Sequence, residues 1–138
     1  MDFLTSDQRS RLMSKVRHNG TDIELLVAHH LRLSGIRFRR NVRTITGSPD
    51  LVFTKSKLAV FIDGDFWHGY RFPRWQHKLQ PFWREKIHRN RSRDKSTFRK
   101  LRRSGWKVIR LWQHQIESDC GACIARIVDA LQSNGLRN

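Results

Sequence analysis

Five consecutive apolar residues at 58–62 (LAVFI) constrain the fold of this chain more than any other segment. An uninterrupted apolar run of this length, entered from the turn residues Ser56 and Lys57, is typical of a strand buried on both faces. Such a strand needs one layer of elements above it and another below it. The run therefore predicts a sheet that is covered by helices on two sides.

The rest of the chain supplies those layers. The segment 21–24 (TDIE) has the form of a capping box and predicts a helix that ends at Gly35, while Pro81 predicts the start of a long helix that ends near Gly105. Strands are predicted at 36–39, 51–53 and 106–112, a loop at 64–81, and a last helix at 116–131. The predicted fold class is α/β: a small central mixed sheet flanked by helices on both faces, in a single domain of residues 1–138 with an N-terminal arm at 1–20.

The charge of the chain indicates its partner. It has 28 Lys and Arg against 12 Asp and Glu, a formal net charge of +16. The segment 84–103 alone has ten Lys or Arg and two acids, or +8 of that total. A solvated helix face is the plain alternative, but an excess of this size favours nucleic acid, because neutralised phosphates release counterions. A membrane surface is disfavoured, since no long helix pairs a basic face with a clean apolar one.

The cellular compartment follows from simpler features. The chain has only two cysteines, Cys120 and Cys123, which are too few for a disulfide framework and indicate a reducing cytosol. No secretory signal and no membrane-spanning segment is expected. We therefore expect a cytoplasmic monomer that is large enough to bury its own core.

Two aspartates are the first candidate site residues. Asp50 follows Pro49 at the start of one predicted strand, and Asp63 ends the next. If these strands form a hairpin, both carboxylates lie at the same edge of the sheet, where the backbone carbonyl of Ile62 adds a third oxygen. Such a hard oxygen site suits Mg²⁺, which stabilises the leaving oxygen in phosphodiester hydrolysis. Most aspartates at strand ends are caps or turn residues, and that is the alternative here.

Two further residues could complete the site. His68 comes five residues after Asp63, and an imidazole can take a proton from water near neutral pH. Taken alone, a histidine in a loop is usually a polar surface residue. Glu24 either points towards the same site or only completes its capping box.

The aromatic pair Phe66-Trp67 lies between Gly64 and Gly69. Adjacent residues in extended chain face opposite ways, so the pair is expected to be presented to a partner as a wedge. Proteins that distort a duplex push apolar side chains between base steps in this way. Trp83 could assist, although a core position on the helix stripe is the stronger alternative for it.

In these features the chain resembles the very-short-patch-repair (Vsr) endonucleases, a branch of the PD-(D/E)XK nuclease superfamily. The resemblance runs from about Thr5 to the final helix. Its matching positions are, in order, Arg9-Ser10, Met13, Thr21 and Glu24, Pro49-Asp50, the block 60–68 ending in Phe66-Trp67-His68, Phe82-Trp83, Glu85-Lys86-Ile87, Asn90, Arg93-Asp94, Gly105-Trp106, Val108 and Trp112.

The resemblance implies a PD-(D/E)XK-like fold and a Mg²⁺-dependent enzyme that nicks one strand of a duplex 5′ to the thymine of a T:G mismatch. It implies Asp50 and the Ile62 carbonyl as metal ligands, with Asp63 as a further candidate. It also implies His68 as general base and Glu24 as the residue that orients a metal-bound water. The implied intercalating residues are Phe66, Trp67, Trp83 and Met13, and the implied DNA contacts are Arg9, Lys86, Asn90 and Arg93. Mismatched double-stranded DNA is the implied partner, and mismatch-repair proteins are further candidates.

The chain departs from the family pattern at several positions. Asp63 stands where other members have His, and Asp65 replaces a Cys of the family's structural zinc site. The remaining zinc ligands are largely absent as well, and Cys120 and Cys123 lie elsewhere, so a structural Zn²⁺ is not expected. No Lys follows Asp63 two residues on, which leaves His68 to take over the role of that lysine.

Two other functions compete with mismatch repair. One is a Vsr-like nuclease for restriction, defence or a mobile element, which would cut without needing a mismatch. The other is a non-catalytic protein that binds distorted duplex, which would not need Asp50 together with His68. Nicking assays on matched and mismatched duplex separate the three.

Overall fold

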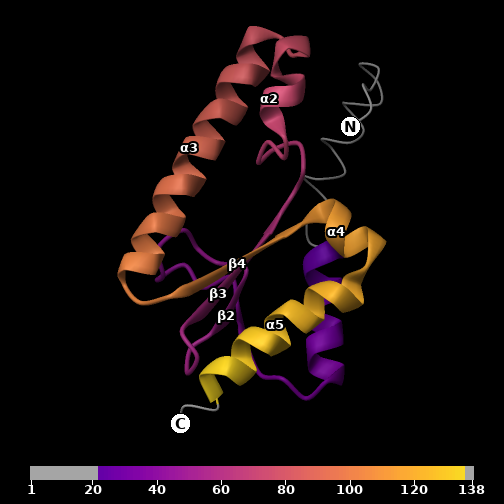
Figure 1. Cartoon of the computed structure of the whole chain (residues 1–138), viewed down its shortest axis with the longest axis vertical. Coiled ribbons are helices and arrows are strands. Elements are labelled where there is room, and N and C mark those ends of the chain that lie inside the picture. Colours follow the sequence, from indigo (N-terminus) through magenta and orange to yellow (C-terminus); the bar gives the residue numbers. More distant parts are fainter. Residues whose placement is uncertain (1–21, 136–138) are drawn as a thin grey trace.

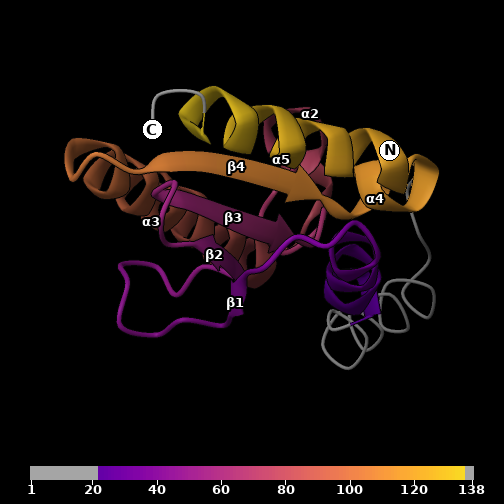
Figure 2. The same ribbon diagram turned by 90° about the horizontal axis from the view of Figure 1, so that it is seen from below.

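The computed structural model describes residues 22–135, and everything said of the structure refers to these residues. It begins with a helix over residues 22–33. The later elements are β1 (Arg39–Arg40), β2 (Leu51–Phe53), β3 (Leu58–Asp63), α2 (Phe72–Trp75), the 3-10 turn η1 (Gln76–Lys78), α3 (Pro81–Arg103), β4 (Lys107–Trp112), α4 (Gln113–Ser118) and α5 (Cys120–Gly135). The fold class is α/β, as predicted, with five α-helices packed against one sheet (Figures 1 and 2).

The four strands form one mixed sheet in the order β1-β2-β3-β4. β1 pairs with β2 and β2 with β3 in antiparallel fashion, whereas β3 and β4 are parallel. A parallel pair needs a crossover connection, and α3 supplies it. β3 lies between two neighbours and all six of its residues are buried, so the prediction of a strand buried on both faces is confirmed.

The side chains of β3 alternate between two cores. Leu58, Val60 and Ile62 belong to the larger one, which is completed by Val27 and Leu31 from the 22–33 helix, Ile116 from α4, and Cys123 and Ile127 from α5. On the other face, Ala59 and Phe61 pack against Phe98 and Leu101 of α3. Figure 2 shows α5 and α3 on opposite sides of the sheet. The alternation places Asp63, the next residue in phase with Phe61, on the α3 face.

A third, aromatic cluster lies beyond the sheet. The first half of α3 projects past the ends of the strands, with α2 beside it (Figure 1). The chain between β3 and α3 packs against the first half of α3 and forms a small core there. This core contains Phe66, Phe72, Trp75 and Leu79 from the connecting chain and Ile87 from α3. We call this part of the molecule the aromatic lobe.

Three predicted boundaries are wrong. The strand expected at 36–39 is reduced to β1, and the loop expected at 64–81 contains α2 and η1. The helix expected at 116–131 is two helices, because the chain turns at Asp119, whose carboxylate accepts a hydrogen bond from the Ala122 backbone N–H and so caps α5. None of the helices within residues 22–135 combines the length and the apolar character that crossing a membrane requires.

Candidate active site

Three charged side chains meet where β3 ends. Asp63, only 5% exposed, comes from the last position of β3, Arg110 from β4 and Asp94 from the buried face of α3. The Arg110 guanidinium donates from Nε to Asp63 Oδ2 at 2.6 Å and from a terminal nitrogen to Asp94 Oδ2 at 2.7 Å. One arginine thus joins a strand carboxylate to a helix carboxylate.

His68 sits between the same two carboxylates. A turn brings it back towards β3, with its backbone N–H bonded to the Gly64 carbonyl at 3.2 Å. Its Nδ1 lies 2.7 Å from Asp94 Oδ2, and its Nε2 lies 3.4 Å from Asp63 Oδ1. Burial opposes ionisation of Asp94, but hydrogen bonds and positive charge from His68 and Arg110 lower its pKa overall. An ionised Asp94 is an acceptor, so Nδ1 of His68 carries the proton and Nε2 is the basic nitrogen.

Asp63 is in a different electrostatic state from Asp94. Burial raises the pKa of Asp63, and the charge of Asp94 adds to this effect, while His68 and Arg110 oppose it. Asp94 therefore stays ionised more readily than Asp63. Of these two carboxylates, Asp63 is the one whose charged form is disfavoured by burial overall.

Asp50 lies on the other side of the site, just before β2. Leu51 pairs with Val60 in the antiparallel register, and the Ile62 backbone N–H, two residues further along β3, donates to Asp50 Oδ2 at 2.6 Å. The hairpin therefore does bring Asp50 next to the end of β3. Burial raises the pKa of Asp50 to about 7; the hydrogen bond from Ile62 opposes the shift, and the charges of Glu24 and Asp63 reinforce it.

Glu24 reaches the site from the 22–33 helix. Burial raises its pKa, although the positive charge of Arg40 opposes the rise. Its Oε1 atom is buried and has no hydrogen-bond partner within the described part of the chain. Glu24 and Asp50 influence each other's pKa, which puts the Glu24 carboxylate close to Asp50. Thr21, its partner in the predicted capping box, lies outside the described residues.

Asp50, Asp63, His68 and Asp94 line a cavity of about 420 Å³, whereas Glu24 and Arg110 do not reach its wall. Its lining combines β3, the turn before β2 and the middle of α3: Gly47, Ser48, Asp50, Phe61, Ile62, Asp63, His68, Arg93, Asp94 and Thr97. The structure thus brings together Asp50, Asp63 and His68, which the sequence singled out separately, and adds Arg93 to the wall.

The aromatic lobe forms the adjoining surface. Trp67 and Trp83 are half-buried, with ring centroids 5.6 Å apart, and the ammonium group of Lys86 lies 5.1 Å from the Trp67 ring. Phe66 is only 5% exposed and lies in the core of the lobe, stacked on Trp75, so its side chain supports the surface in this structure and is not presented as a wedge. The reason is that the chain turns at 64–69, which lets Phe66 face inward.

The structure describes two other residues that were predicted to contact DNA, Asn90 and Arg93. Asn90 donates its side-chain N–H to the Trp67 carbonyl at 2.9 Å, which ties the loop to α3. Arg93 is exposed at the cavity wall. The predicted residues Arg9 and Met13, and the capping residue Thr21, lie outside the described residues.

Two sets of donors could hold a cation. The ligand atoms of Asp63, His68 and Asp94 all lie within 4.8 Å of one another. There, however, Arg110 already supplies positive charge to both carboxylates. Asp50 and Glu24 make no ion pair within the described residues. Arg40 and His68 only partly offset their burial, which raises the pKa of Asp50 to about 7, and one oxygen of Glu24 is buried without a hydrogen-bond partner. This second set fits a divalent cation that binds one or two carboxylates and keeps several waters.

A comparison with protein families identifies the chain. The model described as DNA mismatch endonuclease Vsr matches residues 1–74, more than half of the sequence. The chain belongs to the Vsr endonuclease family.

Individual relatives agree. The chain is 36% identical over 135 residues to the Type II nicking enzyme V.NmeDIP of Neisseria meningitidis serogroup C, covering 96% of this chain and 91% of that one. It is 41% identical over 116 residues to the Type II nicking enzyme V.HpaIIP of Haemophilus parainfluenzae, covering 81% and 82%. It is 32% identical over 108 residues to DNA mismatch endonuclease Vsr of Escherichia coli, covering 76% and 69%.

Within the Vsr family pattern, the two departures have different structural settings. Asp63 is part of the charged network with Arg110. Asp65 faces away from that network and forms an ion pair with His114 of α4 at 2.7 Å, against which the Tyr70 ring packs at 4.3 Å. This contact joins the loop to the segment before α5. Cys120 and Cys123 lie on α5, and burial raises the pKa of both thiols.

Sequence reasoning missed three residues of this Vsr-family site. Asp94 is a carboxylate on an otherwise apolar helix stripe, which is a usable signal, because a buried charge needs a partner. Arg110 is a single charged residue in an apolar stretch of β4, and sequence reasoning did not ask which carboxylate would pair with it. Phe82, 62% exposed and 5.0 Å from the Trp83 ring, extends the aromatic surface, and no signal in the sequence separates it from a core aromatic.

Proposed function

We propose that this Vsr-family protein nicks one strand of duplex DNA without an absolute requirement for a mismatch, in the bacterial cytoplasm and as a monomer. The observation that carries the nuclease proposal is the cavity where Asp50, Asp63 and Asp94 surround His68 beside an exposed arginine. Relatives named as Type II nicking enzymes, at 36% and 41% identity, support strand nicking outside dedicated mismatch repair.

We propose Mg²⁺ as the cofactor, held by Asp50 and the backbone carbonyl of Ile62, with Glu24 orienting a water and Asp63 as a further candidate ligand. When bound, the ion would supply Lewis-acid stabilisation of the charge that develops on the phosphate and on the leaving oxygen. The raised pKa of Asp50 and the unpartnered buried oxygen of Glu24 support this location.

His68 is the proposed general base. Asp94 accepts from Nδ1–H and holds the ring with Nε2 as its basic nitrogen, so that Nε2 can take a proton from the attacking water. Asp94 is then a positioning residue, comparable to the carboxylate that fixes the histidine tautomer in hydrolytic triads. Arg93, exposed at the cavity wall, is the proposed contact for a DNA phosphate.

A strict requirement for a T:G mismatch is the second candidate function, and the aromatic lobe favours it. Trp67 and Trp83 form a half-exposed aromatic surface, Phe82 borders it, and Lys86 places a cation above it. Aromatic faces of this kind stack on unpaired or unstacked bases, which a mispair exposes at lower cost than a matched pair does. Met13 remains a proposed intercalating residue that would enter the duplex opposite these aromatic side chains.

A nicking assay separates the candidates. Labelled duplexes that carry T:G, another mispair or matched pairs are incubated with protein and Mg²⁺, beside Asp50→Ala and His68→Ala controls. Similar rates on matched and T:G duplex support our proposal, whereas cleavage of T:G alone supports dedicated mismatch repair. Cleavage that survives Asp50→Ala would reject the site, and no cleavage by the wild type would favour a protein that only binds distorted duplex.

The aromatic surface needs a separate experiment. If the wild type cuts T:G duplex faster than matched duplex, Trp67→Ala should reduce this preference more than it reduces general duplex affinity, because stacking acts where bases are unpaired. If both quantities fall in proportion, Trp67 serves only to pack the lobe.

A further inference from the structure

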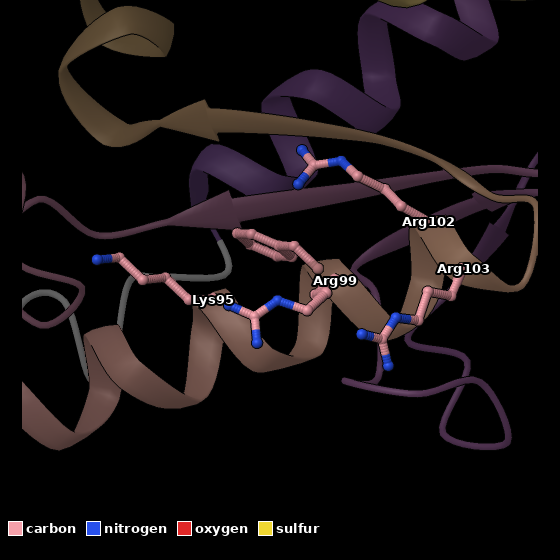
Figure 3. Close-up of a pocket in the computed structure, with 5 residues that line it drawn as sticks. Lys95, Arg99, Arg102 and Arg103 are labelled. Carbon is pink, nitrogen blue, oxygen red and sulfur yellow. The ribbon is translucent and has the colours of Figure 1, made fainter.

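The strongest feature that the proposed site does not use is a hollow on the second half of α3. It has a volume of about 560 Å³ and is lined by Lys95, Phe98, Arg99, Arg102 and Arg103. Figure 3 shows the four cationic side chains reaching out from successive turns of the helix. We call this surface the distal basic face.

The distal basic face lies on the other side of α3 from the catalytic cavity. Arg93 and Thr97 line the cavity, and Lys95 and Arg99 come two residues after them. Two residues along an α-helix correspond to a rotation of about 200°. The buried stripe of Asp94, Phe98 and Leu101 separates the two sides. DNA seated in the cavity therefore does not cover the distal basic face directly.

The cations of this face have no partner inside the described molecule. None of the four side chains makes an ion pair with a carboxylate in the part of the chain that the structure describes. Two cations in the first half of α3 differ, because Lys86 lies over Trp67 and Arg91 over Phe72. Arg89 and Arg93 are exposed like the cations of the distal basic face, which is distinguished by four cations around one hollow.

Stabilisation of the helix explains only part of this charge. Lys100, Arg102 and Arg103 lie in the last turn, where cations interact favourably with the helix dipole. Lys95 lies more than one turn before these residues and Arg99 directly before them, so both are outside the last turn in which that effect acts. They gain nothing visible from the fold, so a ligand outside it is the better explanation for them.

The face is rigid and its spacing suits a nucleic-acid backbone. Phe98 forms its floor, 9% exposed and packed against Phe61 at 4.9 Å. Between Lys95 and Arg102 the helix rises about 10 Å, and phosphates of one strand follow one another at about 3.4 Å along the duplex axis. The face can therefore contact about three consecutive phosphates.

We propose that the distal basic face is a second DNA-backbone site, which holds phosphates outside the segment that is being cut. The inference rests on the proposed function only in taking DNA as the substrate. The phosphates belong either to a flank of the same duplex, bent around α3, or to a second DNA segment.

The test compares Lys95→Gln/Arg99→Gln with a control that removes the same charge, Arg37→Gln/Lys55→Gln, at exposed positions outside α3 and outside the lining of the hollow. Glutamine keeps much of the aliphatic stem, so packing over Phe98 is preserved. Binding is measured without divalent metal at several salt concentrations, on duplexes of about 12 and about 40 base pairs (~40 and ~140 Å). Loss of two phosphate contacts should make the slope of log K against log salt shallower by about 2.

The length dependence identifies the source of the phosphates. A shallower slope on the long duplex alone assigns them to the flank. A shallower slope on the short duplex, together with loss of a second bound duplex per protein molecule, assigns the phosphates to a separate DNA segment. A slope that equals that of the control variant on both duplexes overturns the proposal and leaves the face to solvent or to an acidic protein.

Cleavage is measured separately, so that the two proposals can fail independently. With saturating DNA and Mg²⁺, Lys95→Gln/Arg99→Gln should cut at the wild-type rate, because neither residue touches the cavity. If the wild type does not cut at all while the salt slopes still differ, the proposed nuclease function fails and the second DNA site stands. A variant that binds normally but cuts slowly would contradict the assignment of the face to binding.

Discussion

Burial of Asp50 beside Glu24 and Asp63 has a direct consequence for stability. The folded protein holds the Asp50 proton up to a pH of about 7, whereas the unfolded chain releases it near the ordinary value of 3.8. The folded state therefore binds more protons than the unfolded state between these values. The stabilisation by the Asp50 proton is therefore fully present below pH 3.8, decreases as the pH rises above that value and is lost once the pH has passed about 7.

We predict that the metal-free protein loses stability between pH 5 and pH 8, by an amount on the order of a few kcal/mol. Asp94, whose pKa is lowered, contributes in the opposite sense only at lower pH. Added Mg²⁺ should restore more stability at pH 8 than at pH 5, because the ion competes with protons for Asp50. Urea unfolding with and without Mg²⁺ measures this, and an equal effect of the ion at both pH values would contradict it.

Asp50→Asn should separate stability from activity. The amide can still accept the hydrogen bond from the Ile62 backbone N–H but carries no charge to bury, so the metal-free variant should be more stable than the wild type at pH 8. Cleavage should fall by about 10² to 10⁴-fold, since a metal ligand contributes several kcal/mol to catalysis. The control is Asp119→Asn, which keeps the α5 cap and should change neither quantity.

Asp94→Asn tests the positioning of His68. An amide can present its N–H₂ group to Nδ1 and so favour the wrong tautomer, which should lower kcat by about 10² to 10⁴-fold with little change in DNA affinity. The decisive measurement is the split between kcat and KM, together with the pH profile of cleavage. A rise in KM at unchanged kcat would mean that Asp94 only shapes the binding surface.

At the scale of elements, the aromatic lobe depends on a close approach between its loop and α3. Gly69 has a φ of +69°, and a Cβ there would lie 2.8 Å from Ile87 Cγ2 and 2.7 Å from Arg91 Cδ. Gly35 ends the 22–33 helix at a similar φ of +74°, yet a Cβ there meets nothing within 4 Å. An added side chain at Gly35 meets only the conformational penalty of the left-handed backbone. At Gly69 it meets the same penalty and a steric clash, so comparing the two positions separates these two free-energy costs.

We therefore predict that Gly35→Ala costs about 1 to 2 kcal/mol, the penalty for a left-handed residue with a side chain. Gly69→Ala should cost about 1 to 3 kcal/mol more, because the new methyl group overlaps buried Ile87. Urea unfolding of both variants gives the comparison. Equal losses would show that the lobe can adjust without strain.

Elements were predictable where one local rule decided them. Pro81 marks the start of α3 and the apolar run at 58–62 marks β3. Prediction failed where local signals were weak or divided: Asp119 interrupts an otherwise continuous amphipathic helix, and α2 lies in a segment rich in aromatics and Pro. At Asp119 a local cap, the hydrogen bond from the Ala122 backbone N–H, separates α4 from α5, whereas Phe72 and Trp75 of α2 pack in the core of the aromatic lobe.

At the scale of the whole molecule, the net charge of +16 sets the mode of association with DNA. We predict that duplex affinity falls by about 10³-fold or more between 50 and 200 mM salt, as for proteins with six to ten phosphate contacts. Fluorescence anisotropy with a matched duplex measures this without cleavage when divalent metal is omitted. A flat profile would remove the electrostatic basis of both DNA sites.

Local patterns in the amino-acid sequence are sufficient to predict the α/β class, the buried central strand, the basic character of α3 and the presence of carboxylates, imidazole and aromatics around β3. These properties depend on composition and on periodicity over a few residues. The sequence also identified the Vsr family, because many positions match the family pattern in the same order.

Only the tertiary structure decided which of these groups touch. Arg110 is 47 residues from Asp63 and 16 from Asp94, and it meets both only because β4 pairs with β3 in one register while α3 docks on the same face. The same docking buries Phe66, leaves Trp67 and Phe82 at the surface, and turns Lys95 and Arg99 away from the cavity. Contacts between distant segments depend on register and helix rotation, which no local pattern encodes.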